Sequence, residues 1–116
     1  MANEITATAT LNITLTGQTA SGTTTFQANL TGDFVGEEQD IGITSETLGL
    51  GDITLPKVVY IRNMDTTNFV QVDSATTFDK FPQKIYPGQA VLLLPETATI
   101  YIKADTAPLK IFTVAG

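Results

Sequence analysis

The chain contains no histidine, no cysteine and no tryptophan, and its only arginine is Arg62. Without cysteine, disulfides, thiolate nucleophiles and thiolate metal sites are all excluded. Without histidine, Ser21, Ser45 and Ser74 have no imidazole to activate them, and no Gly-x-Ser-x-Gly motif occurs. We therefore expect a non-enzymatic protein with no catalytic residues, no metal and no cofactor.

Positive charge is scarce and is confined to one half of the chain. Residues 1–56 hold seven acidic residues and no basic one, whereas residues 57–116 hold five acidic and six basic residues. A chain with no Lys/Arg cluster cannot neutralise a row of phosphates, so we expect no nucleic-acid partner. The same charge disfavours anionic membranes. The acidic half serves either solubility or complementarity to a basic partner.

Long apolar runs are also absent. No stretch approaches eighteen uninterrupted apolar residues, and the first residues lack a basic region followed by an apolar one. At 116 residues the chain is long enough to bury a core of its own. We expect one soluble β-sandwich domain over residues 1–116, made in the cytoplasm and without a membrane segment.

The clearest pattern that is present lies in residues 5–16, where apolar and polar residues alternate over twelve positions. This period of two predicts a β-strand of an antiparallel sheet with one dry face and one wet face. The wet face is almost wholly threonine, which favours the pleated backbone and offers hydroxyls for hydrogen bonds. The partner interface predicted on this strand consists of Thr6, Thr8, Thr10, Thr14 and Thr16.

A second alternating run follows a loop predicted over residues 17–22, so Thr23–Thr31 is expected to form a hairpin with the first strand. From Gly32 to Pro56, frequent glycines weaken the pattern. We interpret residues 32–56 as a long crossover connection or an arm that carries one or two short strands. One strand is predicted at Ile41–Thr44, and a single helical turn is predicted at residues 45–48.

The second half of the chain predicts six strands and one well-defined turn. Pro87 and Gly88 fit the central positions of a type II turn. Leu92 lies in a continuous apolar run, which predicts a buried central strand. Together these features predict an all-β antiparallel sandwich, Greek-key or jelly-roll-like, of about eight strands. The strands predicted here cover residues 57–63, 69–72, 84–86, 90–94, 99–103 and 109–114.

Three groups of side chains offer weaker candidates for a site. Asp33, Glu37, Glu38 and Asp40 form either a calcium loop or a solvated acidic loop. Aromatic side chains near the predicted strands either fill the core or line a sugar platform. Arg62 is expected to pair with a nearby carboxylate, such as Asp65 or Asp105, more readily than with a ligand.

Residues 60–70 (Tyr-Ile-Arg-Asn-Met-Asp-Thr-Thr-Asn-Phe-Val), Lys84–Gln89 and Tyr101–Ala107 carry a resemblance to a known family. In these segments, and in the opening Met-Ala-Asn-Glu-Ile, the chain resembles small β-sandwich virion structural proteins of tailed bacteriophages. The resemblance implies a non-enzymatic part of the virion that is made in the host cytoplasm. It is attached to the head shell as a decoration or cement protein or, as the less favoured alternative, to the tail. The implied partner is the major capsid protein or another virion protein.

The resemblance also implies self-association around a symmetry axis. The first predicted strand supports this, because it is unusually long and lacks the lysine, proline or bulge that protects a free edge. We expect a homotrimer in which this strand makes intersubunit contact through its threonine side. The alternative is that the edges are covered within one chain, one by the hairpin partner Thr23–Thr31 and the other by the C-terminal strand. The alternative function, from another class, is a glycan- or receptor-binding module of a phage tail or tip, which exposed tyrosines on a sandwich would support.

Overall fold

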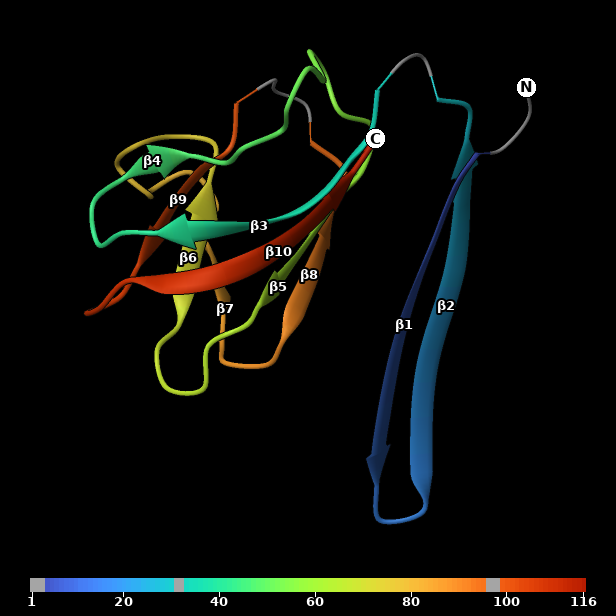
Figure 1. The fold of residues 1–116 in the computed structure, drawn as a ribbon. Coiled ribbons are helices and arrows are strands. Elements are labelled where there is room, and N and C mark those ends of the chain that lie inside the picture. The colour runs from blue at the N-terminus through green and yellow to red at the C-terminus, as the bar shows by residue number, and fades with distance from the viewer. Residues whose placement is uncertain (1–3, 31–32, 96–98) are drawn as a thin grey trace. The chain divides into compact units, whose positions relative to one another are not determined.

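The computed structural model describes residues 4–30, 33–95 and 99–116. The chain divides into two compact units, one ending at residue 31 and the other beginning at residue 32. Within the described residues there are ten strands and no helix, and every strand pairing is antiparallel (Figure 1). The all-β antiparallel class predicted from the sequence is confirmed.

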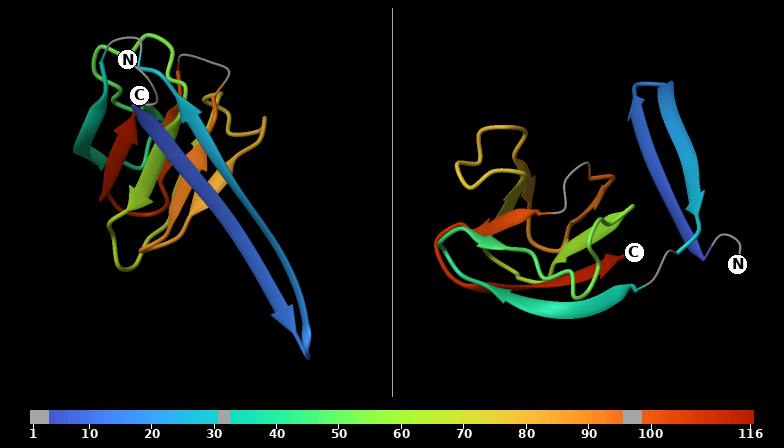
Figure 2. Two further views of the ribbon diagram at one scale, coloured as in Figure 1. Left: turned by 90° about the vertical axis from the view of Figure 1, so that its right-hand side faces the viewer. Right: turned by 90° about the horizontal axis from the view of Figure 1, so that it is seen from above.

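The first unit is a long two-stranded hairpin. Strand β1 (Ile5–Leu15) pairs with β2 (Gln18–Ala28) over eleven residues each, and both views of Figure 2 show the strands side by side along their length. Thr16 and Gly17 form the two-residue turn with φ angles of 43° and 80°. Because both angles are positive, the turn matches the twist of the strands. The loop predicted over residues 17–22 is therefore wrong, and most of that segment is strand.

The second unit is a sandwich of two four-stranded sheets, in which the chain changes sheet at every step except from β6 to β7. This strand order is that of a jelly roll. The first sheet has the order β3 (Val35–Ile41), β10 (Leu109–Ala115), β5 (Val59–Asn63) and β8 (Ala90–Leu93). The second has the order β4 (Glu46–Thr47), β9 (Tyr101–Ala104), β6 (Val70–Asp73) and β7 (Gln83–Ile85).

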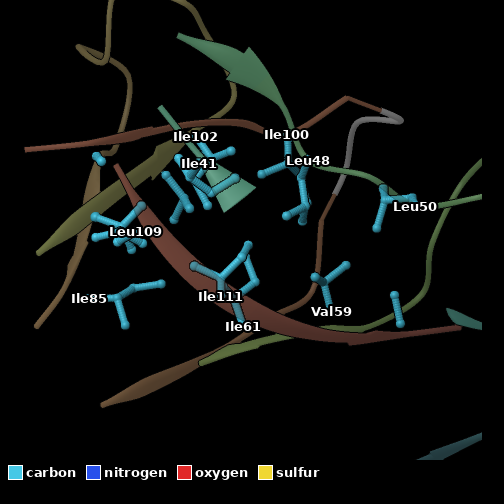
Figure 3. Packing of buried hydrophobic residues seen from close by; sticks show 14 of the residues in the cluster. Ile41, Leu48, Leu50, Val59, Ile61, Ile85, Ile100, Ile102, Leu109 and Ile111 are labelled. Carbon is cyan, nitrogen blue, oxygen red and sulfur yellow. The ribbon is translucent and has the colours of Figure 1, made fainter. Parts of the chain in front are cut away.

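Aliphatic side chains fill the space between the two sheets. Ile41, Ile61, Ile102 and Ile111 are fully buried there, and Figure 3 shows how they gather from both sheets. The sequence left open whether the aromatic residues fill this core. All nine aromatic residues are described, and only Phe78 is buried. The core cluster between the sheets therefore consists of aliphatic side chains, which fit the gap between facing sheets.

Two predictions between residues 32 and 56 are wrong. The strand there is β3, which ends at Ile41 instead of beginning at it, and residues 46–47 form β4 instead of a helical turn. Strand β3 lies at the edge of its sheet, where one neighbouring strand, β10, supplies its backbone hydrogen bonds. An edge strand with a solvated face does not need apolar residues on that face. The polar sequence of β3 therefore gave no strand pattern that could be recognised.

Leu92 is not buried on a central strand, contrary to the prediction. Strand β8 lies at the edge of its sheet, and the Leu92 side chain is 36% exposed. Val91 and Leu93 pack against the core instead. Side chains alternate between the faces of a strand, so Leu92 lies on the outer face in register with Tyr60.

The other predictions for the second half agree with the structure. All six strands predicted there are present, with ends shifted by at most two residues. The predicted turn at Pro87 and Gly88 is confirmed, because Gly88 has a φ of 76° and the Gln89 N–H donates to the Tyr86 carbonyl at 3.0 Å.

Candidate interaction surfaces

One face of the β1–β2 hairpin is lined with hydroxyl and amide side chains, and we call it the hydroxyl face. Three cross-strand pairs of threonines lie within hydrogen-bond distance, with Oγ1–Oγ1 distances of 3.3 Å, 3.3 Å and 3.5 Å. The pairs are Thr8 with Thr25, Thr10 with Thr23, and Thr14 with Thr19. Each hydroxyl has further lone pairs, so the face can still bind an outside partner. The other members of the face are Thr6, Asn12, Ser21 and Gln27.

The structure places four of the five predicted interface residues on this face. Thr6, Thr8, Thr10 and Thr14 are all exposed members of β1. Thr16 does not belong with them, because it is in the turn at the tip of the hairpin. Their role in binding a partner remains a prediction.

The opposite face of the hairpin is mostly apolar, and we call it the apolar face. It was expected to be dry, and Ile5 at the start of β1 is buried, yet Leu11 is 66% exposed, Ile13 57% and Leu15 71%. A two-stranded ribbon has no second layer to cover its apolar side, and such a ribbon is only marginally stable alone in water. The face consists of Ile5, Ala7, Ala9, Leu11, Ile13 and Leu15 of β1 and Gln18, Ala20, Gly22, Thr24, Phe26 and Ala28 of β2.

Asn63, one of the residues that carry the family resemblance, connects three segments of the jelly roll. Its buried side-chain amide donates to the carbonyls of Asn68 at 2.9 Å and Ile85 at 2.8 Å, and its Oδ1 accepts from the Asp65 N–H at 2.8 Å. Its backbone also bonds to Gln89 and Gly88. Asn63 therefore holds the β5–β6 turn against β7 and the turn that follows it.

Two carboxylates close turns through backbone donors. The N–H groups of Asn68 and Thr67 hold the pKa of Asp65 below its ordinary value. Burial raises the pKa of Asp73, but the N–H groups of Lys80, Ser74 and Phe81 outweigh it, so this pKa is also lowered. The lowered pKa of each carboxylate is therefore explained by the turn that it closes.

An open cleft of about 660 Å³ lies along the side of the jelly roll where β7 and β8 are the edge strands. Exposed Phe81 and Leu92 line it together with the polar groups of Gln83, Ser74 and Asp73. The cleft thus offers one exposed aromatic ring, that of Phe81, beside polar side chains. Tyr86 does not line the cleft, and its ring packs against that of Phe69 with centroids 5.8 Å apart.

The acidic segment does not gather its carboxylates at one point. Glu37, Glu38 and Asp40 lie on strand β3, where Glu38 and Asp40 face Lys110 Nζ at 3.6 Å and 3.9 Å. In the described parts of the chain no three acidic side chains come together in a way that could hold a metal ion. The strand geometry spreads them along an edge, and Lys110 partly balances their charge.

Among the described residues, Arg62 forms no ion pair with either of the carboxylates named for it, Asp65 and Asp105. Its exposed side chain stands on the outer face of β5, and the salt bridges found among the described residues all involve Lys110. Asp65, one of its two predicted partners, instead accepts the backbone hydrogen bonds of the β5–β6 turn. The prediction failed because backbone donors next to Asp65 satisfy its carboxylate locally.

Comparisons with protein-family models, curated proteins and solved structures found no match. Over residues 4–30, 33–95 and 99–116, the structure contains no helix long and apolar enough to cross a membrane.

Proposed function

We propose that this chain is a non-enzymatic structural component of a tailed-bacteriophage virion, a decoration or cement protein that binds and stabilises the head shell. The observation that carries the proposal is the β1–β2 hairpin, a long regular ribbon with an exposed hydroxyl face and with Leu11, Ile13 and Leu15 exposed on its apolar face. Solvent-exposed ribbons with an apolar face are typical of segments that are completed by a partner. The sequence resemblance to virion proteins names the class of that partner.

The architecture agrees with this proposal without deciding it. Jelly rolls are common among viral capsid domains, and they also occur in lectins. A fold of this kind supports many functions, so the function must be argued from its surfaces. The hairpin favours assembly, because it presents extended surface and open strand edges to other chains.

The hydroxyl face is the surface proposed to meet the head shell. Residues 5–28 contain no charged side chain, although the whole chain carries a net charge of −6. Threonine hydroxyls can both donate to and accept from a partner's backbone, and they need no counter-charge. Binding through this face should therefore change little between low and high salt.

The proposal is tested by adding the purified protein to purified phage heads that lack it. We expect it to co-sediment with the heads, to appear as ordered density by cryo-electron microscopy, and to raise the temperature at which the heads open. Thr8→Glu combined with Thr10→Glu should abolish binding, because each change buries a charge in the interface. Ser45→Glu, an exposed change on the jelly roll, is the matched control and should bind normally. Absence of this protein from purified virions would contradict the proposal.

A second candidate function is a glycan- or receptor-binding module of a tail or tip, and the cleft beside β7 and β8 is the observation that favours it. Phe81 is 79% exposed there and stands beside polar Gln83 and Ser74, a combination that suits a sugar ring. A glycan array should then show binding that Phe81→Ala removes. Phe34→Ala removes another exposed ring, 71% exposed, that does not line the cleft, and this variant should retain the binding. An array without hits would remove this candidate.

A further inference from the structure

In the half of the apolar face nearest the turn, large side chains on β1 lie beside small residues on β2. Strand β1 contributes the large side chains of Leu11, Ile13 and Leu15, which form a ridge. The register places Gly22 directly beside Leu11 and Ala20 beside Ile13, so β2 forms a furrow next to that ridge. A surface with a ridge and a matching furrow side by side can be complementary to itself.

Copies related by rotation about an axis parallel to the hairpin can bring the ridge of one copy against the furrow of the next. Such a rotation brings β1 of one copy next to β2 of the following copy, and the two strands run antiparallel. The ridge of each copy then faces the furrow of the next. No charged side chain lies between residues 5 and 28, so copies of this acidic chain can meet there without placing like charges in contact.

The size of the face and its open edges decide how many copies are needed. A ribbon of eleven-residue strands is about 36 Å long and about 10 Å wide, so two faces together cover roughly 700 Å². Specific interfaces usually bury about 1,200 Å² or more. A pair would also leave all four strand edges open. Three copies can join each β1 edge to a neighbouring β2 edge, which closes a six-stranded barrel with no free edge.

We propose that the apolar face of the β1–β2 hairpin is a self-association surface, on which three copies of this chain close a barrel with Leu11, Ile13 and Leu15 inside. The sequence alone predicted a trimer through the threonine side of the strand, and the structure favours the opposite side. The hydroxyl face then lies outside the barrel and stays free for another partner. The inference does not depend on the proposed role in a virion.

The experiment compares neighbouring residues on opposite faces of β1 by analytical ultracentrifugation of the full chain. The parent protein should sediment at about three times its 12.4 kDa. Ile13→Glu, which places a charge inside the barrel, should sediment as a monomer. Thr14→Glu, one residue away on the hydroxyl face, should remain a trimer. A parent that stays monomeric at high concentration, a closed dimer, or dissociation by Thr14→Glu alone would overturn the proposal.

A second measurement keeps the inference testable if Ile13→Glu also unfolds the hairpin or if both charged variants dissociate. The chain has no cysteine, so Leu11→Cys and Asn12→Cys each create a unique thiol on one face. Both positions are exposed in the single chain. We expect a thiol reagent to modify position 11 at least tenfold more slowly than position 12. Equal rates, or protection of position 12 alone, would show that the apolar face is not buried between copies.

Discussion

The hairpin and the jelly roll are both antiparallel β-structure, yet they differ in what their apolar sides meet. Ile13 on β1 and Ile111 on β10 both occupy apolar positions on regular strands. Ile13 is 57% exposed, whereas Ile111 is fully buried because a second sheet lies across from it. Alternation therefore determines which way a side chain faces, and a facing layer determines whether it is buried.

The largest expected difference between the two units comes from truncating these matched isoleucines. Ile111→Ala should lower the free energy of unfolding of the jelly roll by about 4 kcal/mol, because it leaves a cavity in a packed core. Ile13→Ala should change it by less than about 0.5 kcal/mol in dilute monomer. All three tyrosines lie in the jelly roll, so their fluorescence during denaturant unfolding reports this unit. Equal losses would show that the hairpin contributes to the jelly-roll core.

A second comparison uses two asparagines. Asn63→Ala should destabilise the jelly roll by about 3 kcal/mol, because it removes three side-chain hydrogen bonds and leaves buried backbone groups unsatisfied. Asn12→Ala, an exposed position on the hairpin, should cost less than about 0.5 kcal/mol. Both values come from the same denaturant titration. A small effect at Asn63 would mean that water replaces its network.

Acid should lower the stability of the jelly roll but not that of the hairpin. The lowered pKa values of Asp65 and Asp73 stabilise the fold above their ordinary value of 3.8, and this contribution is lost as the pH falls through the folded-state values. The loop after β6 should therefore lose hydrogen-exchange protection in acid, whereas the hairpin, which has no titratable side chain from residue 5 to 28, should not. Asp73→Asn should flatten this pH dependence, and an unchanged profile would contradict the role given to Asp73.

The smallest expected effect concerns the hairpin alone. Thr16 is a β-branched residue with a φ of 43°, a conformation that asparagine tolerates far better. Thr16→Asn should stabilise the hairpin by about 1 kcal/mol. Hydrogen exchange of the β1 and β2 amides should slow, while the tyrosine-reported stability of the jelly roll stays constant. Thr14→Asn, in the strand itself, serves as the control and should give no such gain.

Several features could be predicted from the sequence because each depends on a short stretch of chain. The alternation in residues 5–16 indicated a strand and its two faces, and the apolar runs of the second half indicated six further strands. Pro87 and Gly88 indicated their turn, since the backbone angles available to these two residues fit few other structures. The threonines of the hydroxyl face were found in the same way.

Other features depend on which segments meet, and no local pattern contains that information. Asn63 reaches Ile85, twenty-two positions away, and Asp73 reaches the N–H groups of residues 80 and 81, so neither role is visible in the sequence nearby. The polar strand β3 exists because β10 pairs with it. Leu92 faces outward because its neighbours on β8, Val91 and Leu93, are the ones that pack against the core.

Local backbone preference and side-chain direction follow from short stretches of sequence, because steric limits and a period of two act within a few residues. Tertiary structure alone decided which apolar faces are covered. The strands of the second unit found a facing sheet and formed a jelly roll, whereas β1 and β2 pair only with each other among the described strands. Burial requires a second layer, and whether one is present depends on contacts between distant parts of the chain.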